Sequence, residues 1–431
     1  SFSRRQRQMC IRDRFYSIEM KLQLINSINK ENILKLFILL IAFILPFEKI
    51  IIRYSLVLFA LFCLFIADYK QLKDRQNWIK LSLISLWILP FLQLLILNKL
   101  DIYWEHLMTK LTLLIIPILV LTCYKPHEIK IGKVLKFFTL GCLISVLFCM
   151  LNSLFSYYFL GNIKAFNYTS LSIFHHPGYF TMYLNFVIGI TYLALLKPIE
   201  FFNISIKRSI IIISLLTLFI LIASSRTGWI TNILLHIIFL TIIIINKKFN
   251  KKIFIYLLIL VVPFVSIIYI NPTIKLRFNE LVKNAINLEN SKKVSSSSNV
   301  RRKTWLTSTK LIKEKWLLGY GTGIGKKALQ EQYKKDGYDY MYKKNFNAHN
   351  QFLQVLIDHG LIGFLILSFY TFIMIYNSIM KKKFIYTIFL SIMILNFLTE
   401  SILETQSGVI FFAFFNTILF FNWFNLKTLN T

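Results

Sequence analysis

The chain has 431 residues, of which 56% are hydrophobic and only 16% are charged. Soluble domains carry about 25% charged residues, so this composition excludes an ordinary soluble protein. Lys and Arg outnumber Asp and Glu by 50 to 19, which gives a formal net charge of +31. Such a surplus is typical of proteins that bind nucleic acid or anionic lipid, and of membrane proteins with basic cytoplasmic loops. Because long apolar runs separate the basic segments, we expect a membrane protein and no nucleic-acid partner.

Residues 1–19 are basic and aperiodic, and we expect them to be a non-native or disordered N-terminal extension. After them, apolar runs that approach the length of a membrane crossing, about 20 residues, recur along the chain. About twelve transmembrane helices are predicted from this pattern, at residues 33–47, 50–67, 79–97, 107–124, 135–160, 178–197, 209–223, 228–246, 253–270, 352–377, 384–399 and 406–425. The expected fold class is therefore an all-α polytopic membrane protein. Helices one to nine would lie in residues 20–270 and helices ten to twelve in residues 351–431.

The distribution of positive charge predicts the orientation of these helices. Lys and Arg in short loops mark the cytoplasmic side, and they are concentrated in the even-numbered connections between the predicted helices. Both termini are therefore expected in the cytoplasm, and residues 271–350 are expected to form a large periplasmic loop. Within this loop, residues 291–299 have the composition of a flexible linker, and residues 305–316 have the spacing of an amphipathic helix.

The polar residues that stand out against the apolar background all fall on the predicted outer side. Ionisable groups at membrane depth are costly and usually mark a functional pathway. The residues concerned are His175, His176, Arg226, Arg301, Arg302, His349, Asn350, Glu400 and Glu404. This gathering on one face predicts a polar site there.

Three arginines are candidates for binding an anion. Arg226 lies between two apolar runs in Ser-Ser-Arg-Thr-Gly, where its guanidinium and the neighbouring hydroxyls would suit an anion. The alternative is a loop arginine that extends to the outer water. Arg301 and Arg302 open the predicted amphipathic helix, where the positive end of the helix dipole favours phosphate. They could equally form a solvated basic face.

His349 is the candidate general base. It stands in Asn-Ala-His-Asn-Gln, directly before predicted helix ten, with Asn350 as an orienting partner. An imidazole titrates near neutrality and can accept a proton from a sugar hydroxyl. It could also simply cap the helix. Glu400 and Glu404, spaced i to i+4, are predicted to share one helical face and either to hold Arg226 or Arg301 or to be polar boundary residues.

The rest of the sequence shows no motif for nucleotide binding and no visible set of metal ligands. The glycine-rich segment 319–325 lacks both the preceding strand of a dinucleotide fingerprint and the pattern of a phosphate-binding loop. We expect it to be a turn that approaches a ligand backbone. There is no Asp-x-Asp and no metal-ligand spacing of His and Cys, so no cofactor and no metal are expected.

Taken in order, these motifs resemble those of the O-antigen ligase and polymerase superfamily, bacterial inner-membrane glycosyltransferases of the GT-C class. The resemblance lies in His176-Pro177, in Ser-Arg-x-Gly at 225–228, in Arg-x-x-x-Trp at 301–305 followed by Leu-Gly-x-Gly-x-Gly, and in Ala-His-Asn-x-x-Leu-Gln at 348–354. It implies that Arg226 and Arg301 bind the diphosphate of an undecaprenyl-diphosphate-linked glycan and that His349 is catalytic. Arg302, Asn350, His176, Glu400 and Glu404 would then have supporting roles.

The resemblance and the residues together predict a metal-independent, inverting transfer of a glycan to an acceptor hydroxyl on the periplasmic face of the inner membrane. Ligation of O-antigen to lipid A–core is the first expectation, with lipid A–core or another glycan as acceptor and membrane lipids as surroundings. Polymerisation of the lipid-linked glycan and protein O-glycosylation use the same motifs. A polytopic transporter is the alternative from another class, and the gathering of polar residues on one face, away from the midplane, argues against it.

Overall fold

The computed structural model describes residues 32–74, 77–124, 130–200, 202–245, 275–276, 279 and 297–423. Throughout these ranges the chain forms helices and connecting turns with no β-strand, which confirms the predicted all-helical class for this part of the protein. The predicted ninth membrane helix, residues 1–19 and residues 291–296 of the predicted linker lie outside the described residues.

Five described helical segments are long and apolar enough to cross a membrane, and a bent pair would make a sixth. The five are Trp78–Ile96, α8 (Ile131–Tyr158), α9 (Pro177–Leu196), α11 (Arg226–Ile245) and Gln351–Met380. The bent pair is α6 (Leu100–Thr109) with α7 (Thr112–Cys123), whose axes differ by 57°. Within the described residues, length and composition therefore support five or six spans, and the count of about twelve stays a prediction.

The other described elements are shorter. Trp78–Ile96 consists of α4 (Trp78–Leu81), η2 (Ser82–Ile84) and α5 (Ser85–Ile96), and Gln351–Met380 of α17 (Gln351–Ser368), the π-helical η3 (Phe369–Ile373) and α18 (Met374–Met380). The rest are a helix at Asn32–Ile44, α2 (Lys49–Leu64), α3 (Lys70–Lys73), α10 (Ile206–Ile222), α14 (Ser297–Glu314), α15 (Ile324–Lys335), α16 (Asp339–Lys343), α19 (Phe384–Phe397), η4 (Ile402–Glu404) and α20 (Gln406–Trp423).

The centre of the bundle is built around α9, which packs against α8, α10, α11 and α19. Gly228 of α11 makes one of these contacts close, because a Cβ at this position would lie 2.5 Å from the Thr181 hydroxyl oxygen of α9. Inside the same contact the Asn185 amide donates to the Gly228 carbonyl, at 3.0 Å, and accepts from the Asn232 amide, at 3.1 Å. These buried polar contacts hold the first turn of α11, and with it Arg226, at a defined position against α9.

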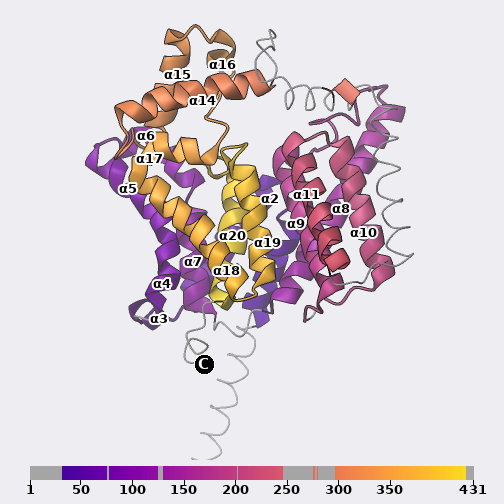
Figure 1. The fold of residues 1–431 in the computed structure, drawn as a ribbon. Coiled ribbons are helices and arrows are strands. Elements are labelled where there is room, and N and C mark those ends of the chain that lie inside the picture. The colour runs from indigo at the N-terminus through magenta and orange to yellow at the C-terminus, as the bar shows by residue number, and fades with distance from the viewer. Residues whose placement is uncertain are drawn as a thin grey trace, which may run out of the picture.

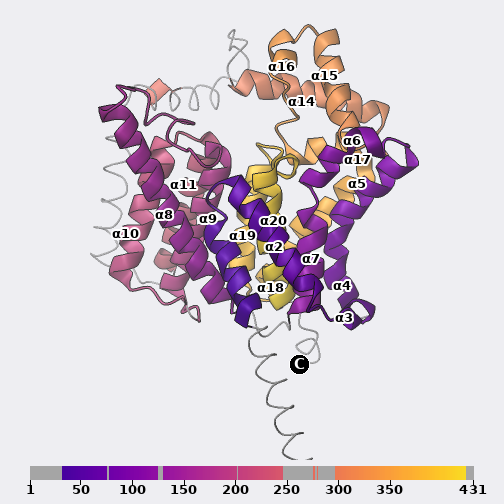
Figure 2. The same cartoon turned by 180° about the vertical axis from the view of Figure 1, so that it is seen from behind.

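A small helical cap lies at one end of the bundle. Figures 1 and 2 show α14, α15 and α16 together at this end, while α3 and α18 lie toward the opposite end. The cap has a hydrophobic core of its own, which contains Leu311, Leu329, Tyr333 and Met341 and is completed by Ile357 of α17. Residues 305–314 of the predicted amphipathic helix lie in α14, which ends at Glu314, two residues before the predicted end. Because α14 already begins at Ser297, residues 297–299 of the predicted linker are helical instead.

The cap is joined to α17 at a break in that helix. Gly360 has φ +61°, and Leu361 donates its N–H to the Trp316 carbonyl at 2.8 Å. The glycine-rich turn fits against the same break, with Gly321 donating to the Asp358 carbonyl at 2.7 Å. A Cβ on Gly319 would stand 2.6 Å from the Asp358 carbonyl carbon. Gly319 and Gly321 of this turn therefore approach the backbone of α17, and the expected approach of the turn to a ligand stays a prediction.

Candidate functional site

The turn between α19 and α20 carries the residue that assembles the site. Glu400 follows the C-terminal end of α19, and its N–H donates to the Asn396 carbonyl at 2.9 Å. One carboxylate oxygen, Oε1, accepts from Arg301 Nη2 at 2.9 Å, and the other, Oε2, lies 2.9 Å from His349 Nδ1. A single carboxylate thus brings together α14, the segment before α17 and the α19–α20 turn.

The cluster of Arg301, His349 and Glu400 is mostly enclosed but still reaches solvent. The side chains of these residues are 25%, 23% and 23% exposed. Burial acts to raise the pKa of Glu400, but the hydrogen bond and charge of His349 and the charge of Arg301 outweigh it, so the pKa lies below its ordinary value. Glu400 is therefore an anion at neutral pH and acts as an acceptor at both oxygens.

The contact with Glu400 determines which nitrogen of His349 can act as a base. A carboxylate can only accept hydrogen bonds, so Nδ1 carries the proton. In the neutral ring, Nε2 is then the unprotonated nitrogen, and the described part of the chain places no hydrogen-bond partner on it. This is the tautomer that a general base needs.

The backbone holds the imidazole in place. His349 has φ +45°, a left-handed backbone conformation that residues other than glycine rarely adopt. Its N–H donates to Asn347 Oδ1 at 3.0 Å. Asn350 caps α17 by accepting from the N–H groups of Phe352 and Leu353, at 2.9 and 3.1 Å. The same Asn350 side chain donates to the Leu398 carbonyl at 3.2 Å, which ties the start of α17 to the turn that carries Glu400. Strained residues of this kind are often found at functional sites.

Arg226 is brought to the same region through its neighbour. It is the first residue of α11, and its side chain is partly buried. Ser224, two residues before it, has a φ of +54°. Thr227 Oγ1 lies 2.8 Å from Thr399 Oγ1, so the residue after Arg226 is hydrogen-bonded to the residue before Glu400. The structure therefore places the backbone of Arg226 beside the cluster of Arg301, His349 and Glu400.

Three further predicted residues lie outside this cluster. Arg302 is exposed on α14, and among the described residues the Glu400 carboxylate contacts Arg301 and His349 instead. His176 caps α9, with Nδ1 accepting from the Gly178 N–H at 3.3 Å and Nε2 3.1 Å from the Tyr168 hydroxyl. His175 is buried, with its ring nitrogens 3.0 Å from Ser407 Oγ and 3.3 Å from the Leu45 carbonyl. Both histidines thus have local structural contacts.

Glu404 has a different partner from Glu400. Its Oε1 is 2.6 Å from Lys110 Nζ, and the two side chains are 14% and 5% exposed. The prediction that both acids share one helical face is wrong, because α19 ends at Phe397 and Glu404 closes the separate short helix η4. Each acid instead pairs with its own cation.

Sequence reasoning missed Lys110, which lies near the start of the predicted helix 107–124 and was given no role in the site. The signal for it is that the run 107–124 begins with a charge that a straight membrane helix would have to bury. The structure places Lys110 at the bend between α6 and α7. Thr227 and Thr399 were also missed, since nothing in the sequence distinguishes them from other threonines. Across the described residues, no group of three or more His, Cys, Asp or Glu side chains could hold a metal ion.

The fold and the site define the class of protein: a helical membrane protein with an arginine, imidazole and carboxylate cluster at one end of its bundle, beneath a helical cap. Residues 211–368 match the family model described as O-Antigen ligase, and this match supports the resemblance to the O-antigen ligase superfamily over that segment. The match begins in α10 and ends with α17, so it includes Arg226, Arg301 and His349 and stops before Glu400. It indicates glycan transfer of the O-antigen ligase or polymerase type. No curated protein matches the chain.

Proposed function

We propose that this protein transfers a glycan from an undecaprenyl-diphosphate-linked donor to an acceptor hydroxyl, and that the acceptor is lipid A–core. The observation that carries the proposal is the Glu400 carboxylate, which bonds Arg301 and His349 at 2.9 Å each. This contact places a potential base and a cation on opposite oxygens of one group. The family match supports the class of reaction. The identities of the donor and of the acceptor are proposed here.

The first half of the reaction is removal of the acceptor proton. In the proposed step His349 Nε2 accepts the proton of the acceptor hydroxyl as its oxygen attacks the anomeric carbon of the donor sugar. The ring then becomes an imidazolium, and its Nδ1–H remains bonded to the Glu400 carboxylate. Glu400 stabilises the charge that develops on the ring, which is the role of a carboxylate behind a catalytic histidine. Proton transfer of this kind contributes about 10²–10⁴-fold in rate.

The second half is departure of the diphosphate. The bond from the anomeric carbon to the diphosphate oxygen breaks, and the leaving group gains negative charge. Arg301 uses one of its N–H groups on Glu400, and a guanidinium has five donors, so the rest of the fork can bind phosphate oxygens. Arg226, at the start of α11, would supply a second guanidinium. A single displacement of this kind inverts the configuration at the anomeric carbon.

The surroundings fit a lipid-linked donor. We propose that the end of the bundle with α14–α16 faces the periplasm and that residues 271–350 form the periplasmic loop between membrane segments 20–270 and 351–431. The donor's polyprenyl chain would then stay in the bilayer beside the helices, while its diphosphate meets the cluster at their ends. This orientation also puts both termini in the cytoplasm and the protein in the inner membrane.

The test is transfer by the purified protein in lipid bilayers with defined acceptors. Labelled lipid-linked glycan is supplied with lipid A–core, with a second lipid-linked glycan, or with a serine-containing acceptor peptide. We expect label to move to lipid A–core. Transfer only to the second lipid-linked glycan would contradict ligation and identify a polymerase, and transfer only to the peptide would identify protein glycosylation.

A further inference from the structure

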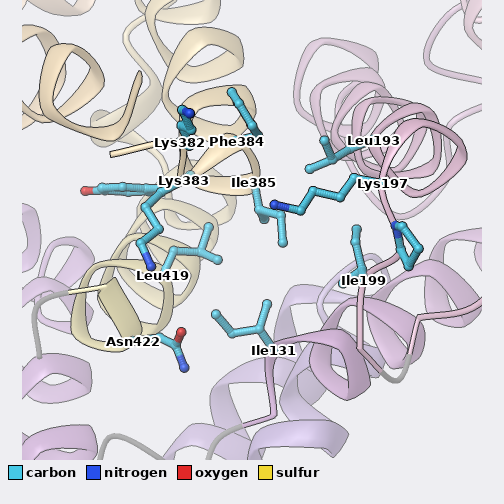
Figure 3. A pocket seen from close by; sticks show the side chains of 12 residues that line it. Ile131, Leu193, Lys197, Ile199, Lys382, Lys383, Phe384, Ile385, Leu419 and Asn422 are labelled. Atoms are coloured by element: carbon cyan, nitrogen blue, oxygen red, sulfur yellow. The ribbon is translucent and has the colours of Figure 1, made fainter. Parts of the chain in front are cut away.

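A second polar feature lies at the end of the bundle away from the cap. A cavity of about 210 Å³ opens between the ends of four helices. Its lining residues come from the start of α8, the end of α9, the α18–α19 turn with the start of α19, and the end of α20: Ile131, Leu193, Lys197, Pro198, Ile199, Lys382, Lys383, Phe384, Ile385, Tyr386, Leu419 and Asn422. Figure 3 shows this arrangement, and Figure 1 shows α18 at the end opposite α14–α16.

The cavity combines apolar walls with positive charge. Leu193, Ile385 and Leu419 form part of its walls, and Lys197, Lys382 and Lys383 contribute three ammonium groups. In Figure 3 the Lys197 side chain extends toward Ile385, and that of Lys383 extends past Leu419 toward Asn422. None of the lining residues is acidic. The pocket is therefore built for a ligand with an anionic group and an apolar part.

Within the described residues, the positive charge of the pocket is not neutralised by the protein around it. In the described part of the chain the three lysine side chains have neither a hydrogen bond nor an ion pair. The nearest acid in the sequence is Glu200, which follows Ile199, and its carboxylate lies 3.7 Å from Lys130. The first turn of α19 adds to the positive electrostatic potential of the pocket, because helix N-termini favour anions. Lys383 is the N-cap residue of this helix, and its side chain makes no capping hydrogen bond.

We propose that this pocket binds the phosphate headgroup of an anionic phospholipid from the surrounding leaflet. Basic pockets between the ends of membrane helices are typical headgroup sites. An inorganic phosphate would satisfy the lysines equally well, but it would leave the apolar walls in contact with water. The lipid's glycerol and upper acyl carbons would cover these walls and remove them from water.

Binding at this place has a structural consequence. The lipid would connect the end of α9 to the start of α19 and the end of α20. Those two helices carry Glu400 on the turn at their other end. The lipid would therefore stabilise the relative position of α19 and α20, the helix pair that positions Glu400. This proposal holds whether or not the cluster performs the proposed transfer.

The test is lipid retention by the full-length protein in detergent, measured by native mass spectrometry. Phosphatidylglycerol and phosphatidylcholine with identical acyl chains are added at equal concentration. We expect the phosphatidylglycerol adduct to dominate in the wild type. In the triple variant K197Q/K382Q/K383Q the affinity for phosphatidylglycerol should fall about tenfold, which corresponds to about 1.4 kcal/mol of binding free energy. The matched control is K70Q/K73Q/K207Q, which removes the same charge from exposed positions on α3 and α10 outside the pocket. This control should retain the adduct.

Two further measurements distinguish lipid binding in the pocket from nonspecific electrostatic attraction and from binding of free phosphate. Leu193→Phe narrows the cavity without changing charge, and it should also reduce the phosphatidylglycerol adduct. Inorganic phosphate at a concentration equal to that of the lipid should not displace it. Equal loss in the two triple variants would contradict a specific site, as would full retention in Leu193→Phe. Displacement by inorganic phosphate would show that the pocket takes a free anion and would overturn the lipid proposal.

Discussion

Glu400 makes two contacts that constrain each other. Its carboxylate accepts from a guanidinium on one oxygen and from an imidazole on the other, and the three side chains are each about three-quarters buried. Removing one partner of such a group leaves the others with an uncompensated charge or an unsatisfied donor, which costs more than the pair itself contributes. The geometry of His349 and Arg301 therefore depends on the charge at position 400.

Replacing Glu400 with Gln tests this dependence in the transfer reaction. The amide oxygen can still accept from His349 Nδ1, but it carries no charge to stabilise an imidazolium. We expect transfer to fall by about 10²-fold, the lower end of what a general base contributes, while the donor still binds. Glu400→Asp should recover part of the loss. The measurement is initial transfer rate in proteoliposomes, with the exposed Glu331→Gln on α15 as the charge-matched control. Equal rates for Glu400→Gln and this control would remove Glu400 from the site.

The lowered pKa of Glu400 also predicts how stability depends on pH. Its value in the folded protein lies below the ordinary 4.5, because the hydrogen bond from His349 and the charge of Arg301 outweigh the effect of burial. A carboxyl of this kind contributes stability that is fully present above pH 4.5 and is lost as the pH falls through the folded-state pKa. Below pH 4.5, the unfolding temperature of the wild type should therefore drop more steeply than that of Glu400→Gln. Thermal unfolding in detergent from pH 7 to pH 3 measures this, and parallel curves for the two proteins would contradict it.

At the scale of elements, the sequence predicted some parts of the site and could not predict others. The spacing of residues 305–316 predicted a helix, and the structure has α14 there. Helix capping was the alternative role of His349, but the residue that caps α17 is its neighbour Asn350. The pairing of Glu400 with His349 was not predictable, since 51 residues separate them and the contact depends on where α19 ends. The i to i+4 spacing of Glu400 and Glu404 suggested one helix, but the chain turns between them.

A substitution at the break in α17 should have a clear effect on the stability of the protein. Gly360 has φ +61°, and a Cβ there would lie 2.3 Å from the Leu317 carbonyl oxygen. Gly360→Ala must therefore separate the cap from α17, and we expect it to destabilise the protein by more than the 1–3 kcal/mol that the strained backbone alone costs. Gly337→Ala is a matched control, because Gly337 also has a positive φ, +69°, but open space around it. Unfolding temperatures should fall clearly further for Gly360→Ala, and equal falls would show that the close approach is unimportant.

For the whole molecule, composition and apolar runs were sufficient to predict a helical membrane protein, because a bilayer requires nearly every backbone polar group to be satisfied within the segment. The number of membrane spans could be predicted less well from the sequence. Several described helices, such as α2 and α10, are shorter than a membrane crossing requires, and α6 and α7 form a bent pair in place of one straight helix. Bends of this kind depend on tertiary partners such as the contact of Lys110 with Glu404, which no local pattern encodes.

The proposed orientation makes a direct prediction for labelling. Lys335 on α15 and Lys73 on α3 are both exposed and belong to opposite ends of the bundle. In a background without the native cysteines, Lys335→Cys should react with a membrane-impermeant thiol reagent in intact spheroplasts, and Lys73→Cys only after lysis. The reverse pattern would place the cluster in the cytoplasm and exclude a periplasmic reaction.

The central claim is that His349 takes the acceptor's proton while the arginines hold the donor, and measuring donor binding and transfer separately tests it most directly. In purified His349→Ala we expect transfer to fall by about 10²–10⁴-fold with donor binding nearly unchanged. Arg301→Ala should weaken donor binding as well as transfer, and the exposed Arg302→Ala should do so less. Near-normal transfer by His349→Ala would contradict the account, because the cluster would then be an anion site without a base.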